Sequence, residues 1–375
     1  MHLAYPDGMR SPSLAHVVWL RRSVAAAALA CLLVTGGAAA PGAARAAGPT
    51  LAHLVGQRLV VAFHGTTASR SLRVRIRTGR IGGVILFGSN ITSESQLKAL
   101  TSSLRAAATA GGRPTPIIAV DQEGGLVRRL GWAPPKRSAQ EMGQLRPAQV
   151  QSIGAATAAR LRADGINVDL APVADVPDGP ADFIWQQHRA FSTSRYRVAR
   201  DAPAFAQGLE SGHVWPTFKH FPGLGQATVS TDDALVRIDA SARTLVRRLL
   251  PYRVAINRPL NPVVMLSTAV YPALDNRAAA WSPQIIRGLL RKQLGFGGVT
   301  ITDSLDPAAA VRHATVTRLA LKSAAAGADL VLITGSGATS VAVYDRLLAA
   351  ARAGTLRRSQ LQASYTRILA LKSNL

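Results

Sequence analysis

The sequence predicts an α/β protein, a (β/α)8 barrel of the TIM type in a single domain. Short apolar runs rich in β-branched residues recur along the chain, and ten or more residues with helical spacing follow each run. Eight such units occur, which is the number that closes a parallel barrel. We expect the strands at residues 59–63, 83–87, 116–120, 167–172, 216–219, 262–266, 299–302 and 329–333.

The helices between these strands have readable ends. Ser93 with Gln96 resembles a capping box, Gly165 and Gly327 follow expected helices, and Ser359 can cap the last one. An open doubly wound sheet is the alternative, but no strand is followed by a G-x-G-x-x-G phosphate turn. We expect the helices at residues 93–110, 146–164, 197–212, 241–256, 282–294, 307–326, 338–351 and 359–371.

The first 46 residues have the pattern of a secretory signal peptide. Arg21 and Arg22 precede an apolar run at 24–34, and small residues follow as far as position 47. The run is shorter than the roughly 20 residues that a membrane-spanning helix needs. We therefore expect a signal peptide at 1–46, the barrel domain at 47–375, and a secreted or cell-envelope protein whose mature chain has no transmembrane segment. The paired arginines also allow twin-arginine export, and Cys31 allows a lipid anchor, although the apolar run continues past it.

The formal charge is strongly positive. It is +24 for the whole chain, and +21 remains without the first 46 residues, which carry a net +3. The arginines are scattered through helical segments, with no basic tail or array of stacking aromatic residues, so the pattern does not favour nucleic-acid binding. A polyanionic cell-wall surface is the expected partner of this charge. Residues 47–375 contain no cysteine, so the core alone must stabilise the fold.

Polar side chains stand directly after several expected strands, where a barrel gathers its active site. Asp121 follows the third strand and Asp175 follows the fourth. Lys219 and His220 end the fifth, and Asp303 follows the seventh.

Three motifs at these positions resemble glycoside hydrolase family 3, in its branch of single-domain β-N-acetylglucosaminidases. They are Asp121-Gln-Glu-Gly-Gly125, Lys219-His-Phe-Pro-Gly223 and Ile301-Thr-Asp-Ser-Leu305. Further similar segments span residues 82–87, 167–175, 189–191, 271–275 and 326–329, so that the resemblance covers nearly all of 51–375.

The resemblance implies a role for each matching residue. Asp303 occupies the place of the family's nucleophile, since a carboxylate can add to an anomeric carbon and leave again. Glu123 and Asp175 are interpreted as residues that order loops. The residues expected to hold the sugar are Asp121, Arg129, Arg189, Lys219 and His220.

The sequence departs from the family pattern where the general acid is expected. Leu224 replaces the second histidine of the family's Lys-His-Phe-Pro-Gly-His motif, and Ser230-Thr-Asp232 stands in place of Asp-Ser-His. Thr268 likewise replaces a histidine that the family often shows. With the Asp-His dyad absent, Asp232 is the preferred candidate for the acid, and Asp233 is the alternative.

The sequence therefore predicts a retaining exo-glycosidase that acts on β-linked N-acetylglucosamine-type sugars of cell-wall fragments, with Asp303 and Asp232 as its catalytic pair. The partner is a saccharide, no metal or organic cofactor is implied, and the oligomeric state stays open. Two alternatives remain. One is a sugar-binding protein that has lost its acid, and the other is a β-glycosidase for a different sugar.

Overall fold

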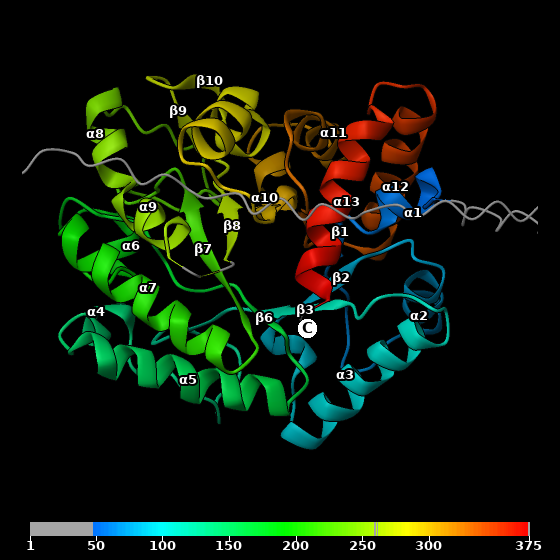
Figure 1. Ribbon diagram of the computed structural model, residues 1–375, viewed down its shortest axis with the longest axis horizontal. Helices are drawn as coiled ribbons and strands as arrows, with labels where there is room; N and C mark the ends of the chain where they lie inside the picture. Colours follow the sequence, from blue (N-terminus) through cyan, green and yellow to red (C-terminus); the bar gives the residue numbers. More distant parts are fainter. Residues whose placement is uncertain (1–47, 259, 261, 374–375) are drawn as a thin grey trace, which may run out of the picture. The chain divides into compact units, whose positions relative to one another are not determined.

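Eight parallel strands form the centre of the protein (Figure 1). The computed structural model describes residues 48–258, 260 and 262–373, so the expected signal peptide and Cys31 lie outside the described residues. Strands that follow one another along the barrel lie side by side, and the first strand also pairs with the last. A bridge between Ile301 and Leu330 joins the two ends of the sheet. The strands are β1 (Leu59–Val61), β2 (Gly83–Leu86), β3 (Ile117–Val120), β6 (Val168–Asp169), β7 (Trp215–Phe221), β8 (Val263–Leu266), β11 (Thr300–Thr302) and β12 (Val331–Ile333).

All eight strands overlap the segments expected from the sequence, and the TIM-type barrel is confirmed. Two short antiparallel hairpins accompany the barrel. They pair β4 (Gln122–Gly124) with β5 (Val127–Arg128), and β9 (Val270–Tyr271) with β10 (Asp275–Ala278).

Helices form the outer layer (Figure 1). The main ones are α1 (Leu51–Gly56), α2 (Arg70–Arg77), α3 (Glu94–Thr109), α5 (Pro147–Ala163), α7 (Arg195–Ser211), α8 (Ala242–Arg248), α9 (Leu250–Ile256), the π-helix η3 (Gln284–Gln293), α10 (Leu305–Ala310), α11 (Val316–Ala326), α12 (Gly337–Arg352) and α13 (Arg358–Lys372). Single turns lie at η1 (Gly88–Asn90), α4 (Ala139–Met142), α6 (Phe183–Gln186) and η2 (Ala279–Trp281). None of the helices in the described ranges is long and apolar enough to cross a membrane.

Two of the expected helices are wrong in their continuity. The segment 241–256 is divided into α8 and α9, and Pro251 stands in the first turn of α9, where its missing N–H costs no helical hydrogen bond. The segment 307–326 begins earlier, at Leu305, and is interrupted between α10 and α11, where Thr315 caps α11. The segment 282–294 is helical but wound as a π-helix.

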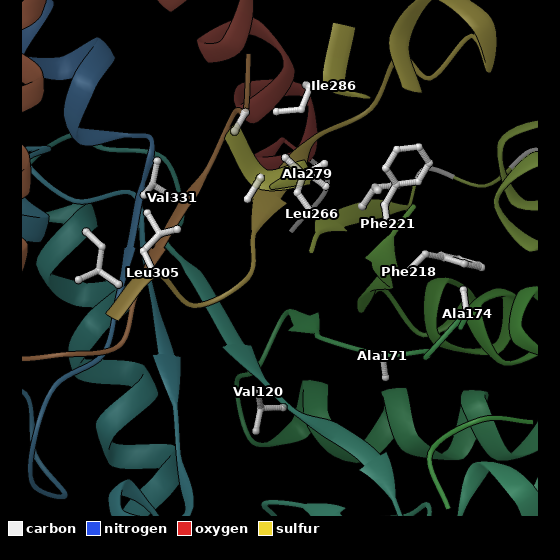
Figure 2. Close-up of a cluster of buried hydrophobic side chains, with 14 of the residues drawn as sticks. Val120, Ala171, Ala174, Phe218, Phe221, Leu266, Ala279, Ile286, Leu305 and Val331 are labelled. Atoms are coloured by element: carbon white, nitrogen blue, oxygen red, sulfur yellow. The ribbon is translucent and has the colours of Figure 1, made fainter. Parts of the chain in front are cut away.

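Apolar side chains pack on both faces of the strands, because successive residues of a strand point to opposite sides. Val60, Ala119 and Ile301 belong to a cluster inside the barrel. Their neighbours Val61 and Val120 belong to a larger cluster between the strands and the helices. Figure 2 shows part of this outer cluster, including Val120, Phe218, Phe221, Leu266 and Val331. A buried core therefore supports every strand on both faces.

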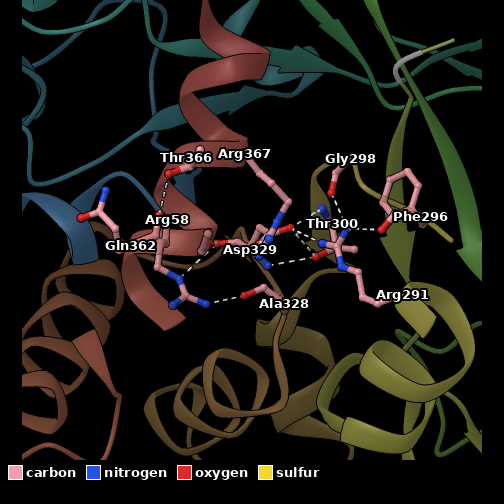
Figure 3. Close-up of polar contacts among 11 residues, drawn as sticks. Arg58, Arg291, Phe296, Gly298, Thr300, Ala328, Asp329, Gln362, Thr366 and Arg367 are labelled. Carbon is pink, nitrogen blue, oxygen red and sulfur yellow. Dashed lines mark hydrogen bonds and ion pairs between the residues drawn. The ribbon is translucent and has the colours of Figure 1, made fainter. Parts of the chain in front are cut away.

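A buried carboxylate holds the amino ends of the last strands together (Figure 3). Asp329 is fully buried and accepts hydrogen bonds from the backbone N–H and hydroxyl of Thr300 at 2.9 and 3.0 Å. Arg291 and Arg367 approach the same carboxylate at 2.5 and 2.7 Å. Arg58 donates to the backbone carbonyl of Asp329 at 3.1 Å. This network lies at the opposite end of the barrel from the carboxyl ends of the strands.

Candidate active site

One cavity of about 490 Å³ opens at the carboxyl ends of the strands. Its floor includes Ile85, Leu170, Met265 and Leu332, which belong to the apolar cluster inside the barrel. The structure brings all seven expected site residues to this cavity: Asp121, Arg129, Arg189, Lys219, His220, Asp232 and Asp303. A second hollow of about 380 Å³ lies at the amino ends of the strands near Trp215 and has none of these residues in its wall.

Four charged side chains form a cluster on one side of the cavity, in which Lys219 and Glu123 are buried and Asp121 and Arg189 are half-buried. Lys219, on β7, contacts Asp121 at 2.7 Å and Glu123 at 2.5 Å. Arg189 donates two parallel hydrogen bonds to Glu123, of 2.8 and 2.9 Å. Two cations and two carboxylates therefore neutralise one another inside the protein, which is the condition under which charges are tolerated there. The arrangement presents fixed donors and acceptors to a ligand.

Glu123 is central to this cluster. Burial by itself would raise the pKa of Glu123, but the charges of Arg189 and Lys219 and their hydrogen bonds outweigh it and lower the pKa to about 2. For Lys219, burial works toward a lower pKa, but Asp121 and Glu123 raise the pKa above its ordinary value. Glu123 and Lys219 are therefore both charged at neutral pH.

The hairpin after β3 sets the position of Arg129. Gln122 is fully buried, and its side-chain oxygen accepts the backbone N–H groups of Arg129 and Leu130, each at 3.0 Å. Gly124 and Gly125 have φ of +99° and +55°, a conformation that glycine adopts without strain. The guanidinium of Arg129 lies 3.8 Å from Asp121 and 5.9 Å from the centre of the Phe87 ring. Arg129 is thus held at the wall of the cavity by the fold of its own loop.

His220 is oriented by a buried carboxylate. Asp175 accepts the backbone N–H of His220 at 3.1 Å and contacts the ring Nδ1 at 2.7 Å. It also accepts the backbone N–H of Leu224 at 2.6 Å. A carboxylate only accepts hydrogen bonds, so this contact places a proton on Nδ1 of His220, and in the neutral ring Nε2 is then the acceptor. Asp175 therefore fixes both the ring and the start of the following loop.

Asp303 follows β11 and is half-buried in the cavity wall. Its backbone N–H donates to the carbonyl of Leu266 at 2.9 Å, which ties its position to the neighbouring strand. One of its carboxylate oxygens accepts the backbone N–H of Ser304 at 2.8 Å. The carboxylate is thus held at the end of a rigid element, with its position set by the barrel.

Asp232 lies in a turn of the loop that follows β7, and Ser230 and Thr231 line the cavity beside it. The turn is closed by Ser230, which accepts the backbone N–H groups of residues 232–234 through its hydroxyl and its carbonyl. The Asp232 carboxyl takes no part in these hydrogen bonds. Partial removal of the carboxyl group from water and then the negative charge of Asp303 raise the pKa of Asp232 to about 6, although the residue as a whole is exposed. Asp233 is not among the residues that line the cavity.

Some residues in and beside the cavity have roles that the sequence does not indicate. Glu123 was expected only to order a loop, yet it lies in the cavity wall between two cations. Asp169 does not line the cavity, but it is fully buried and accepts the backbone N–H of Gln122 at 3.0 Å, and burial raises its pKa to about 8. Its position next to the apolar Val168 in a strand was the available signal. Phe87 and Phe183 also line the cavity.

Within the described ranges, no group of three or more His, Cys, Asp or Glu residues has a geometry that could hold a metal ion. The ionisable side chains that line the cavity belong to Asp121, Glu123, Arg129, Arg189, Lys219, His220, Asp232 and Asp303.

Residues 50–371 match the family described as "Glycosyl hydrolase family 3 N terminal domain". The chain belongs to glycoside hydrolase family 3. It is 35% identical over 87% of its length, and 94% of the relative's, to an uncharacterized secreted glycosyl hydrolase of Arthroderma benhamiae.

Solved structures of family 3 enzymes share this fold. One is the β-N-acetylhexosaminidase of Beutenbergia cavernae, with a TM-score of 0.79, 33% identity, and coverage of 87% of this chain and 99% of that one. Another is the β-N-acetylglucosaminidase of Paenibacillus sp. str. FPU-7, with a TM-score of 0.81 and 31% identity over 87% of this chain. This chain spans 62% of that longer protein. The chain is thus a glycoside hydrolase with a TIM-type barrel.

Proposed function

We propose that this family 3 hydrolase is an exported, retaining exo-β-N-acetylglucosaminidase that acts on cell-wall glycan fragments. The observation that carries the proposal is that Asp303 and Asp232 line one cavity together with the five residues expected to hold a sugar. The names of the two related structures support N-acetylglucosamine as the sugar. The secreted relative supports export.

In the first step, a carboxylate oxygen of Asp303 bonds to the anomeric carbon as the bond to the leaving oxygen breaks. Asp232, protonated in a fraction of molecules set by its pKa of about 6, gives its proton to that oxygen. In the second step, the Asp232 carboxylate takes a proton from water. The resulting hydroxide adds to the anomeric carbon and releases Asp303, and Asp232 is protonated again.

The remaining charged residues bind and orient the sugar. Ion pairs with Asp121 and Glu123 fix the position of the Lys219 ammonium group. Two parallel hydrogen bonds to Glu123 fix the guanidinium of Arg189. In the neutral ring, Nε2 of His220 can accept a hydrogen bond from a hydroxyl group of the sugar. Fixed groups of this kind bind without reorganising, which favours the reaction geometry.

A panel of nitrophenyl glycosides tests the proposal, with the β-N-acetylglucosaminide, β-N-acetylgalactosaminide and β-glucoside as members and Asp303→Asn as the inactive variant. We expect hydrolysis of the β-N-acetylglucosaminide and its loss in the variant. Fastest hydrolysis of the β-glucoside would support a different sugar. Binding of N-acetylglucosamine by calorimetry without hydrolysis of any member would support the sugar-binding alternative and contradict catalysis.

A further inference from the structure

The outer face of α2 presents a stripe of arginines to solvent. Arg70, Arg73 and Arg77 are exposed at positions i, i+3 and i+7 of the helix, whereas Leu72 and Ile76 are buried against the barrel. With 3.6 residues per turn, these three arginines lie on one side of the helix. They span roughly 10 Å along its axis at 1.5 Å per residue.

Further cations surround this stripe. Arg75 donates to the hydroxyl of Ser340 on α12 at 2.8 Å, and Arg80 lies 5.9 Å from the centre of the Tyr344 ring. Arg113 donates to the carbonyl of Arg77 at 3.3 Å, at the end of α2. The six arginines 70, 73, 75, 77, 80 and 113 are named here the α2 arginine face.

Little negative charge opposes the α2 arginine face. None of its six arginines forms an ion pair with an acidic residue in the part of the chain that the structure describes. Asp345 on α12 interacts electrostatically with Arg75. The face therefore carries an excess of positive charge, unlike positions such as Arg160 and Arg200, whose guanidinium groups are paired with acidic residues.

Helix stability does not account for these residues. Cations in the last turn of a helix are favoured by the helix dipole, which explains Arg75 and Arg77. The same dipole disfavours cations in the first turn, where Arg70 stands, and that turn contains no acidic residue. Arg70 thus stands against the electrostatics of its own helix, whereas Arg73 donates to the backbone carbonyl of Ala68 at 2.9 Å. Neither guanidinium has an acidic partner among the described residues, so both are available to an anionic ligand.

We propose that the α2 arginine face binds a linear anionic polymer of the cell wall, one that carries phosphate groups along its chain. Guanidinium groups pair with phosphates through two parallel hydrogen bonds, and three of them in a row match a partner with repeated charges. Figure 1 shows α2 in the outer layer beside α3, and none of the six arginines lines the catalytic cavity. The face anchors the enzyme to the wall while the cavity stays open.

The test uses the mature chain and inorganic polyphosphate as the probe, with binding followed by fluorescence anisotropy at several salt concentrations. The variant Arg70→Gln/Arg73→Gln/Arg77→Gln removes the exposed stripe. The control Arg243→Gln/Arg247→Gln/Arg253→Gln removes the same charge from exposed positions on α8 and α9. Thermal unfolding and hydrolysis of a nitrophenyl glycoside are measured for both variants, and both should match the parent.

We expect the α2 variant to bind polyphosphate about tenfold or more weakly and to lose about two units of the salt slope, since each phosphate contact contributes roughly 0.7–0.9. The control should change little. An equal loss in both variants would overturn the proposal, because net charge alone would then explain binding. Binding to vesicles of anionic lipid but not to polyphosphate would overturn it in favour of a membrane surface. If the protein hydrolyses no glycoside but the α2 variant still binds polyphosphate more weakly than the control, the proposed function is contradicted and this inference is supported.

Discussion

Replacing Glu123 by glutamine should destabilise the protein strongly, because the change leaves two buried cations with one carboxylate. The substitution keeps the shape of the side chain and removes its charge beside Arg189 and Lys219. The pKa of Glu123 is lowered from 4.5 to about 2. At about 1.4 kcal/mol per pKa unit, the charged form contributes on the order of 3 kcal/mol to the free energy of unfolding.

The pH dependence of this loss is also fixed by the structure. A carboxyl group with a lowered pKa stabilises the folded state above its unfolded value of about 4.5, and this contribution disappears as the pH falls toward 2. Urea unfolding followed by circular dichroism should therefore show the full difference between parent and variant at pH 7 and a smaller one at pH 3.5.

Asp239→Asn is the matched control, since Asp239 is 71% exposed and lies 3.6 Å from an exposed arginine. Surface pairs of this kind contribute little. A Glu123→Gln variant as stable as this control at pH 7 would refute the reasoning. An unchanged difference at pH 3.5 would show that lost packing, and not lost charge, is the cause.

Three further predictions concern single carboxyl groups. Asp232→Ala should slow disaccharide hydrolysis by about 10²- to 10⁴-fold but leave the hydrolysis of activated aryl glycosides nearly unchanged. The fall of kcat above pH 6 should disappear, and azide should restore part of the lost activity. Disaccharide hydrolysis at the parent rate would make Asp233 the candidate acid. The parent should lose stability as the pH rises from about 4 to 8, because Asp169 stays protonated in the folded state up to about pH 8, and Asp169→Asn should not show this loss. A difference in urea midpoint between parent and variant that is the same at pH 5 and pH 9 would contradict this. Asp175→Asn should lower kcat/KM about tenfold or more and alter the His220 tautomer seen by nitrogen NMR; an unchanged tautomer would remove the orienting role.

The strands could be predicted from the sequence because burial on both faces leaves a continuous apolar run, as in Ile117–Val120. The helix α2 could not be predicted, since residues 70–80 contain five arginines and only two apolar residues, Leu72 and Ile76, are buried on its inner face. The division at Leu249 depends on the geometry of Pro251 in a helix, which periodicity does not report.

The candidate site likewise contains residues that the sequence predicts and residues that it does not. Positions after strands located Asp121, Lys219, His220 and Asp303, because the carboxyl ends of barrel strands converge. The role of Glu123 could not be read from its position, since it depends on Arg189, which is 66 residues away in the chain. Side-chain partners of this kind are set by the tertiary fold and leave no local pattern.

The identity of the nucleophile is the central claim, and covalent trapping tests it most directly. The mature protein is incubated with a fluorinated β-N-acetylglucosaminide that forms the glycosyl-enzyme quickly and releases it slowly, and its peptides are analysed by mass spectrometry. We expect one added sugar, attached to the peptide that contains Asp303, and none in the Asp303→Asn variant. A sugar attached to a different carboxylate, or turnover of the compound without any labelled peptide under trapping conditions, would contradict the account.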